Sequence, residues 1–273
     1  MGCGKWVKRA IAAYVLLTIA ACSSSGSSSL NRPHLKILML TGPASRELED
    51  ASRSLRTTRV LVVGDRFRPL YDTSWPGAKR VAAFQSYRVF RRSVDSLPSD
   101  VAWVMYDPEP WRFTSVDEQR QPGRAMRLFG HLAHTRGLKV IMAPAPSLVL
   151  VAGASCRRTG DEGMAEAFLR CNMAAKAARA GDMVDLQLQV LERDPSAYEH
   201  FVSAAARQAR AANPRITVLS QLSTSPSTYE ASPAMLATAS RAVKGLVTGH
   251  YLSVGTSEID VARAFLGAGG DLR

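Results

Sequence analysis

Short apolar runs alternate with helix-like patterns along the chain from about residue 35 onward. Most runs are continuously apolar, which is typical of strands covered on both faces, as in a parallel sheet. Eight strands are predicted in this way, at Leu35–Leu40, Arg59–Val63, Val81–Ser86, Val101–Tyr106, Lys139–Ala143, Met183–Gln187, Ile216–Ser220 and Gly245–His250.

Helices are predicted between the later strands, where capping residues or proline precede apolar residues at helical spacing. Their predicted starts are Pro122, Asp194-Pro195 and Ser232-Pro233, and a last helix is expected over Glu258–Leu266. The segments 64–80 and 144–164 show no such pattern, and we expect longer loops there.

Strand–helix alternation with eight strands predicts a single α/β domain over residues 35–273, a TIM-type (β/α)8 barrel. An incomplete, seven-stranded barrel stays open, because the first strand is weakly marked. The main rival is a doubly wound parallel sheet, which usually has a glycine-rich phosphate turn after its first strand. Gly64-Asp65-Arg66 does not have that composition.

Residues 1–22 have the pattern of an export signal. Three basic residues precede the apolar run Ala10–Ala21, which is too short to span a bilayer comfortably. The run ends in Ile19-Ala20-Ala21-Cys22, which resembles the lipobox of bacterial lipoproteins, whose cysteine is acylated and becomes the first residue after cleavage. This resemblance implies lipid on Cys22 and an extracytoplasmic protein held at a bacterial membrane. An ordinary signal peptide cut near Ala21 is the alternative.

A serine-rich segment, residues 23–34, follows and is predicted to be a flexible tether. The formal net charge is +12, and the three basic residues before Cys22 leave +9 on the remainder. This excess favours anionic partners such as a phospholipid surface or acidic cell-wall polymers, although a solvated arginine-rich surface gives the same composition. No basic stripe interleaved with aromatic residues is present, so no nucleic acid partner is expected.

Two cysteines, Cys156 and Cys171, remain beyond the signal segment. In an oxidising compartment such a pair predicts a disulfide, worth roughly 3 kcal/mol. A metal pair is the alternative, but no histidine lies nearby, and HxxxH or HExxH spacings are absent. The chain also lacks a P-loop and a GxSxG elbow. We therefore expect no bound metal and no cofactor. We also expect the protein to be a monomer.

Polar residues follow nearly every predicted strand, and catalytic groups of barrels gather at the carboxyl ends of strands. These positions are Gly64-Asp65, Gln85, Asp107-x-Glu109, Asp185-x-Gln187-x-Gln189, Gln221-x-Ser223-Thr224 and His250-Tyr251. Strand alternation would place Asp185, Gln187 and Gln189 on one face, pointing into the barrel mouth.

The segment Tyr106-Asp107-Pro108-Glu109-Pro110-Trp111 carries two carboxylates at a strand end. Glycoside hydrolysis requires two carboxyl groups beside one bond. The Asp-Pro-Glu sequence resembles the Asp-x-Glu end of the signature of family 18 chitinase-like barrels, although Trp103 and Met105 replace earlier aspartates of that signature. The resemblance implies that Glu109 is the acid and Asp107 its helper.

More broadly, the sequences YDPEPW, DxQxQ and SQLST make the chain similar to exported bacterial barrel proteins related to glycosidases. The hypothesis is a glycan-acting hydrolase with Glu109, Asp107 and Asp185 as catalytic groups and with substrate contacts from Trp111, Gln187, Gln221 and Tyr251. A non-catalytic lipoprotein that binds a cell-envelope glycan or protein is the alternative, and a purely structural envelope protein is a third.

Each of these residues also has a structural interpretation. Glu109 could cap a backbone N–H, and Asp185 could be a buried aspartate bonded to an arginine or to backbone. Trp75 and Trp111 could stack on sugars or simply pack in the fold. His250, at the predicted end of the last strand, is expected to be a structural histidine.

Overall fold

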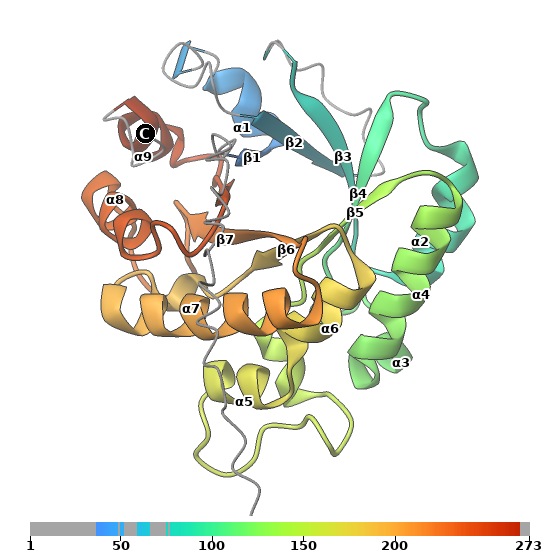
Figure 1. The fold of residues 1–273 in the computed structure, drawn as a ribbon. Helices are drawn as coiled ribbons and strands as arrows, with labels where there is room; N and C mark the ends of the chain where they lie inside the picture. Colours follow the sequence, from blue (N-terminus) through green and yellow to red (C-terminus); the bar gives the residue numbers. More distant parts are fainter. Residues whose placement is uncertain (1–36, 49, 52–58, 66–74, 76, 268–273) are drawn as a thin grey trace, which may run out of the picture. The chain divides into compact units, whose positions relative to one another are not determined.

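The computed structural model describes residues 37–48, 50, 51, 59–65, 75 and 77–267. Within them the chain forms a closed barrel of parallel strands in sequence order, surrounded by helices (Figure 1). The predicted signal segment 1–22, its Cys22 and the predicted tether 23–34 lie outside the described residues.

The strands pair in parallel with their sequence neighbours, and the last strand pairs with the first, with Gly249 opposite Ile37. They are β1 (Ile37–Thr41), β2 (Arg59–Asp65), β3 (Lys79–Phe84), β4 (Val101–Tyr106), β5 (Lys139–Met142), β6 (Met183–Leu186), β7 (Thr217–Ser223) and β8 (Gly249–Ser253). The predicted eight-stranded barrel is confirmed. The incomplete barrel and the doubly wound sheet are thereby excluded.

The α-helices lie outside the strands (Figure 1). They are α1 (Gly42–Glu47), α2 (Tyr87–Ser93), α3 (Val116–Arg120), α4 (Pro122–Thr135), α5 (Met164–Arg170), α6 (Met173–Ala180), α7 (Pro195–Ala212), α8 (Pro233–Ala242) and α9 (Ile259–Gly267). Short 3₁₀ turns are η2 (Val94–Ser96), η3 (Pro146–Leu150) and η4 (Gln189–Leu191).

The predicted caps form. The Asp194 side chain accepts a hydrogen bond from the Ala197 N–H at 3.0 Å at the start of α7. Ser232 does the same for the Met235 N–H at 3.2 Å at the start of α8. Helix α4 begins at Pro122 as predicted. These local interactions explain why the later helices were readable in the sequence.

Several boundaries differ from the prediction. Strand β8 begins at Gly249 rather than at Gly245, because Gly245 has φ +80° in the turn after α8 and cannot continue a strand. Strand β7 extends to Ser223 and so includes Gln221. The predicted loop 144–164 contains η3. The two helices between β5 and β6 carry no cap signal in the sequence and were not predicted.

Alternate strand residues divide the core into two layers. One layer fills the barrel interior, with Met39, Leu61, Val81, Trp103, Ile141, Met183, Leu219 and Tyr251 among its members. The intervening residues, such as Leu38 and Val104, face the helices in the larger outer layer. At the seam, a side chain on Gly249 would overlap the Ile37 carbonyl oxygen, so glycine permits the close approach of β8 to β1.

All eight strands and both core layers come from residues 37–267. Residues 34–273 form one compact unit, so a chain of these residues contains the complete barrel. None of the helices in the described part is long and apolar enough to cross a membrane.

Candidate functional site

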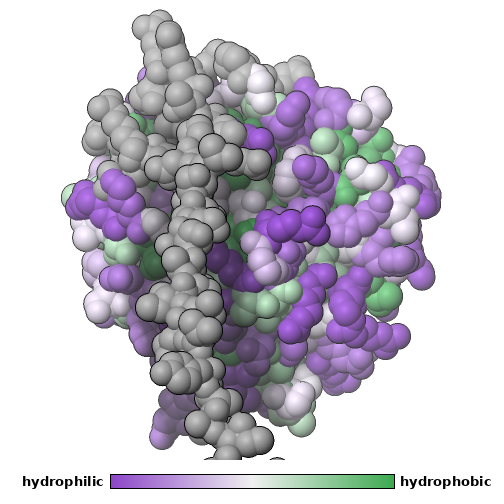
Figure 2. All heavy atoms as spheres, in the orientation of Figure 1, coloured by the Kyte–Doolittle hydropathy of each residue, from purple (hydrophilic) through white to green (hydrophobic). Residues whose placement is uncertain are grey.

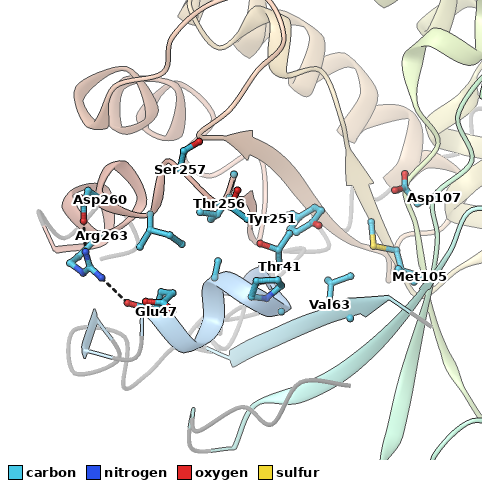
Figure 3. Close-up of a pocket in the computed structure, with 18 of the residues that line it drawn as sticks. Thr41, Glu47, Val63, Met105, Asp107, Tyr251, Thr256, Ser257, Asp260 and Arg263 are labelled. Atoms are coloured by element: carbon cyan, nitrogen blue, oxygen red, sulfur yellow. Dashed lines mark hydrogen bonds and ion pairs between the residues drawn. The ribbon is translucent and has the colours of Figure 1, made fainter. Parts of the chain in front are cut away.

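A cavity of about 860 Å³ opens at the C-terminal end of the barrel. Its walls come from the ends of β1 to β4 and β8, from α1, and from α9 with the loop before it. Figure 3 shows Asp107 at one end, Glu47, Asp260 and Arg263 at the other, and Thr41, Tyr251 and Thr256 between them. The lining is thus rich in hydroxyl and carboxyl groups.

Asp107 follows β4 directly and lines this cavity. Its backbone N–H donates to the Phe84 carbonyl at 2.9 Å, which fixes the chain beyond the end of the strand. The Gln187 Nε2 group donates both to Asp107 Oδ1 at 2.6 Å and to the Ala143 carbonyl at 2.8 Å. Gln187 therefore holds the Asp107 carboxyl against the end of β5.

The pKa of Asp107 is raised to about 7, chiefly by burial and then by the negative charge of Glu109. The hydrogen bond from Gln187 acts in the opposite direction but is the smaller effect. A carboxyl with this pKa can both give and take a proton near neutral pH, which is the requirement for general acid–base catalysis.

Asp185 points into the barrel from β6, as the predicted alternation requires. It is buried, and within the described part of the chain neither of its carboxyl oxygens has a hydrogen-bond partner. Burial, and then the charge of Asp107, raises the pKa of Asp185 well above its ordinary value. Burial thus favours the protonated form of Asp185, which can donate a hydrogen bond.

Tyr251 and Gln221 complete the interior polar group. Burial and the charges of Asp107 and Asp185 raise the pKa of Tyr251, so these three side chains lie close together. Gln221 Oε1 is buried, and so is the Thr41 hydroxyl, and neither has a hydrogen-bond partner among the described residues. The mouth thus holds several polar groups that a hydroxylated ligand could satisfy.

Two of the predicted site residues lie on the rim instead. Glu109 does not line the cavity, although burial raises its pKa. The Trp111 ring is 38% exposed and packs edge-on against Phe113, with ring centroids 5.3 Å apart. Trp111 lines a separate surface hollow rather than the cavity of Asp107. Trp75 is buried and donates to the Ser45 carbonyl, so it packs in the fold.

The predicted disulfide between Cys156 and Cys171 is not formed, and both cysteines are free thiols. The Cys171 thiol donates to the Cys156 carbonyl oxygen, 3.2 Å away. The Lys176 ammonium donates to the Cys156 sulfur at 3.2 Å. The two thiols also interact with each other: burial, and then the hydrogen bond to the Cys156 thiol, raises the pKa of Cys171 to about 11. The described residues also contain no group of three or more metal-ligating side chains.

Glu192 was missed by sequence reasoning. It is buried at the end of η4, and burial raises its pKa to about 8. Its carboxyl accepts from the Ser223 N–H and lies 3.0 Å from the Tyr229 hydroxyl, whose own proton can go to the Gln189 carbonyl at 2.6 Å. If the Tyr229 hydroxyl donates to the Gln189 carbonyl, a protonated Glu192 can donate its own proton to the Tyr229 oxygen. In the sequence, Glu192-Arg193-Asp194 has the composition of an exposed loop, and for this reason Glu192 was not predicted to be buried.

His250 lies inside β8 and faces the helices, not the cavity. Its two ring nitrogens are 2.9 Å from the hydroxyls of Ser220 and Ser240. The structural interpretation of His250 is therefore the correct one.

Comparisons with known proteins support the fold alone. No protein-family model matches the chain, and no curated protein is similar to it in sequence. A search of solved structures finds triosephosphate isomerase from Bartonella henselae, with a TM-score of 0.50 and 10% sequence identity. The match covers 88% of this chain and 100% of the isomerase. At this identity the similarity establishes a TIM barrel and says nothing about the reaction.

Proposed function

We propose that this barrel is a hydrolase acting on a glycan, with Asp107 as its general acid and base. The observation that carries the proposal is a carboxyl with a pKa of about 7 on the wall of a polar cavity of about 860 Å³. Barrel enzymes place their catalytic groups at this end of the strands. The hydroxyl and carboxyl lining suits a polyhydroxylated ligand.

Each residue has a role in this proposal. Protonated Asp107 gives its proton to the glycosidic oxygen as the carbon–oxygen bond breaks, and ionised Asp107 takes a proton from the attacking water. Glu109 does not line the cavity, and its role is to raise the pKa of Asp107 through its negative charge. Gln187 orients Asp107. Asp185, Gln221 and Tyr251 hydrogen-bond to sugar hydroxyls.

A second candidate is a barrel that binds a glycan without cleaving it. The unpartnered buried oxygens of Asp185 and Gln221 favour it, because a bound hydroxylated ligand would satisfy them without any reaction. Here Asp107 is a hydrogen-bonding group, and its ionisation alters affinity only.

The deciding experiment is a hydrolysis screen of residues 34–273 on chitin-type, peptidoglycan-type and neutral glycans. We expect turnover that falls by about a hundredfold or more in Asp107→Asn. The wild-type rate should also show a pH limb near 7, from the pKa of Asp107. Asp161→Asn, an exposed aspartate elsewhere, is the matched control. Equal turnover by Asp107→Asn and wild type would overturn the acid–base role, and binding without turnover would favour the second candidate.

We also propose that the chain is exported and anchored to a bacterial membrane by lipid on Cys22. The lipobox-like sequence Ile19-Ala20-Ala21-Cys22 and the serine-rich segment after it support this. In cells fed a labelled fatty acid, Cys22→Ala should lose the label and leave the membrane fraction, whereas Cys3→Ala should change neither. Labelling that persists in Cys22→Ala would contradict the proposal.

A further inference from the structure

The surface beside the barrel mouth concentrates exposed apolar side chains. The described residues expose five large apolar side chains, and four of them lie in two adjoining hollows formed by α2, the β4–α3 loop, α3 and the start of α4. These four are Trp111, Phe113, Val116 and Leu128, exposed by 38%, 52%, 56% and 40%. We call these four side chains and the arginines described next the rim patch.

Unpaired cations lie in the same hollows. Arg88, Arg91 and Arg124 line the hollow of about 470 Å³ between α2 and α4, and Arg88 also lines the neighbouring hollow of about 650 Å³. Arg112, in the second hollow, lies over the Phe113 ring at 4.9 Å. Within the described part of the chain no carboxylate pairs with any of these four arginines.

The acids nearby leave the patch cationic. Asp117 is exposed and lines both hollows. The Glu118 carboxylate is buried and accepts from the Ser86, Tyr106 and Ser115 hydroxyls and from two backbone N–H groups. It is thus directed inward and fixes the loop that carries the patch. Figure 2 shows hydrophilic side chains over most of the right-hand side of the molecule, where Figure 1 places α2 to α4, with isolated apolar residues among them.

We propose that the rim patch docks on an anionic phospholipid bilayer. Exposed aromatic and aliphatic side chains gain free energy by entering the interface between headgroups and acyl chains, and arginines beside them bind phosphates. The patch combines both on one loop and the helices next to it. A soluble acidic polysaccharide offers phosphate or carboxylate groups but no apolar phase, so it would leave Phe113 and Val116 exposed to water. Docking through this patch would hold the barrel mouth, which contains Asp107, close to the membrane surface.

The test is sedimentation of residues 34–273 with vesicles of phosphatidylcholine alone or mixed with phosphatidylglycerol. We expect binding to the mixed vesicles only. Trp111→Ala/Phe113→Ala should weaken it at least about tenfold. Arg88→Gln, Arg91→Gln and Arg124→Gln should each weaken it about fivefold.

Two controls remove matched groups elsewhere. Leu150→Ala removes the fifth exposed apolar side chain, which lies on η3. Arg215→Gln removes an exposed arginine from the turn before β7, at the opposite end of the barrel. Both should bind like the wild type. Equal losses in the controls and the patch variants would overturn the proposal, because they would indicate a general effect of charge or hydrophobicity.

Tryptophan fluorescence separates docking from misfolding. Trp75 and Trp103 are buried, so Trp111 is the described tryptophan that can meet the lipid. Its emission should shift to the blue on mixed vesicles and be quenched by brominated lipid, and Trp111→Phe should keep binding but lose both signals. Binding without these signals, or equally strong binding to a soluble acidic polysaccharide, would also overturn the proposal.

Discussion

The barrel mouth and the rim patch lie close together, yet they differ in how far their ionisable side chains are exposed to solvent. In the mouth, Asp185 is buried and Asp107 is half-buried on the cavity wall, and burial raises the pKa of both carboxyls. On the rim, Arg88 and Arg112 are exposed to solvent. The comparison teaches that burial in the mouth raises the pKa of carboxyl groups so that they hold their protons more tightly, whereas the rim keeps its side chains in contact with water.

The first prediction concerns the group that joins the two regions. Glu118→Ala should lower the free energy of unfolding by about 3–5 kcal/mol, because it removes the acceptor of several buried hydrogen bonds beneath the rim. Urea denaturation measures this. Asp117→Ala, the exposed neighbour, should change it by less than about 0.5 kcal/mol. A small effect of Glu118→Ala would show that the rim does not depend on this carboxylate.

The second prediction concerns pH. Asp107 and Glu192 keep their protons in the fold up to pKa values of about 7 and about 8, whereas the unfolded chain ionises them near pH 4. Unfolding therefore releases protons in this window, so stability should fall by up to about 4 kcal/mol for each of the two groups as pH rises from about 4 to about 8. Urea midpoints across that range measure the slope. Glu192→Gln should flatten it, and an unchanged slope would contradict the buried state of Glu192.

The third prediction concerns Asp185. Replacing this partnerless buried acid by leucine should raise the free energy of unfolding by about 1–3 kcal/mol while weakening any ligand of the mouth. Thermal unfolding and glycan binding, measured on the same variant, test both parts. A loss of stability would instead mean that Asp185 has a structural partner.

The fourth and smallest expected effect is on the rim. Arg112→Gln should leave the free energy of unfolding within about 0.5 kcal/mol of the wild type, since the arginine is exposed and its contact within the described part of the chain is with the Phe113 ring. The same variant should weaken vesicle binding about fivefold. Urea denaturation and sedimentation in parallel would separate a binding role from a structural one.

Much of the fold was readable because its signals are local. Apolar runs marked the strands, the first of them only weakly, and the caps at Asp194 and Ser232 marked two helices. The predicted start of β8 was wrong because a glycine such as Gly245 is compatible with both a helix end and a strand start. Its positive φ in the structure shows that it ends the helix. The alanine-rich helix α6 was missed because alanine has no polar contrast to show a face, and packing against α4 and α7 decides its position.

The site was readable only in part. Alternation along β6 correctly predicted that Asp185 points inward, since period-two patterns are a property of the strand itself. Glu192 and Glu118 had no signal, because an acid in a loop or short helix looks the same whether it is exposed or buried. Cys156 and Cys171 lie together, but the predicted disulfide is not formed, because the sequence does not fix whether two neighbouring thiols are oxidised.

By itself, the sequence determined the barrel, the strand ends where polar groups gather, and the inward face of β6, because all three follow from local periodicity and capping. Only the tertiary structure determined which of those polar groups are buried away from solvent. Closure of β8 onto β1 encloses Asp185, Tyr251 and Gln221, while the loop after β4 leaves Trp111 outside. The reason is physical: a pKa depends on how much solvent surrounds a group, and solvent is excluded by residues far away in the chain.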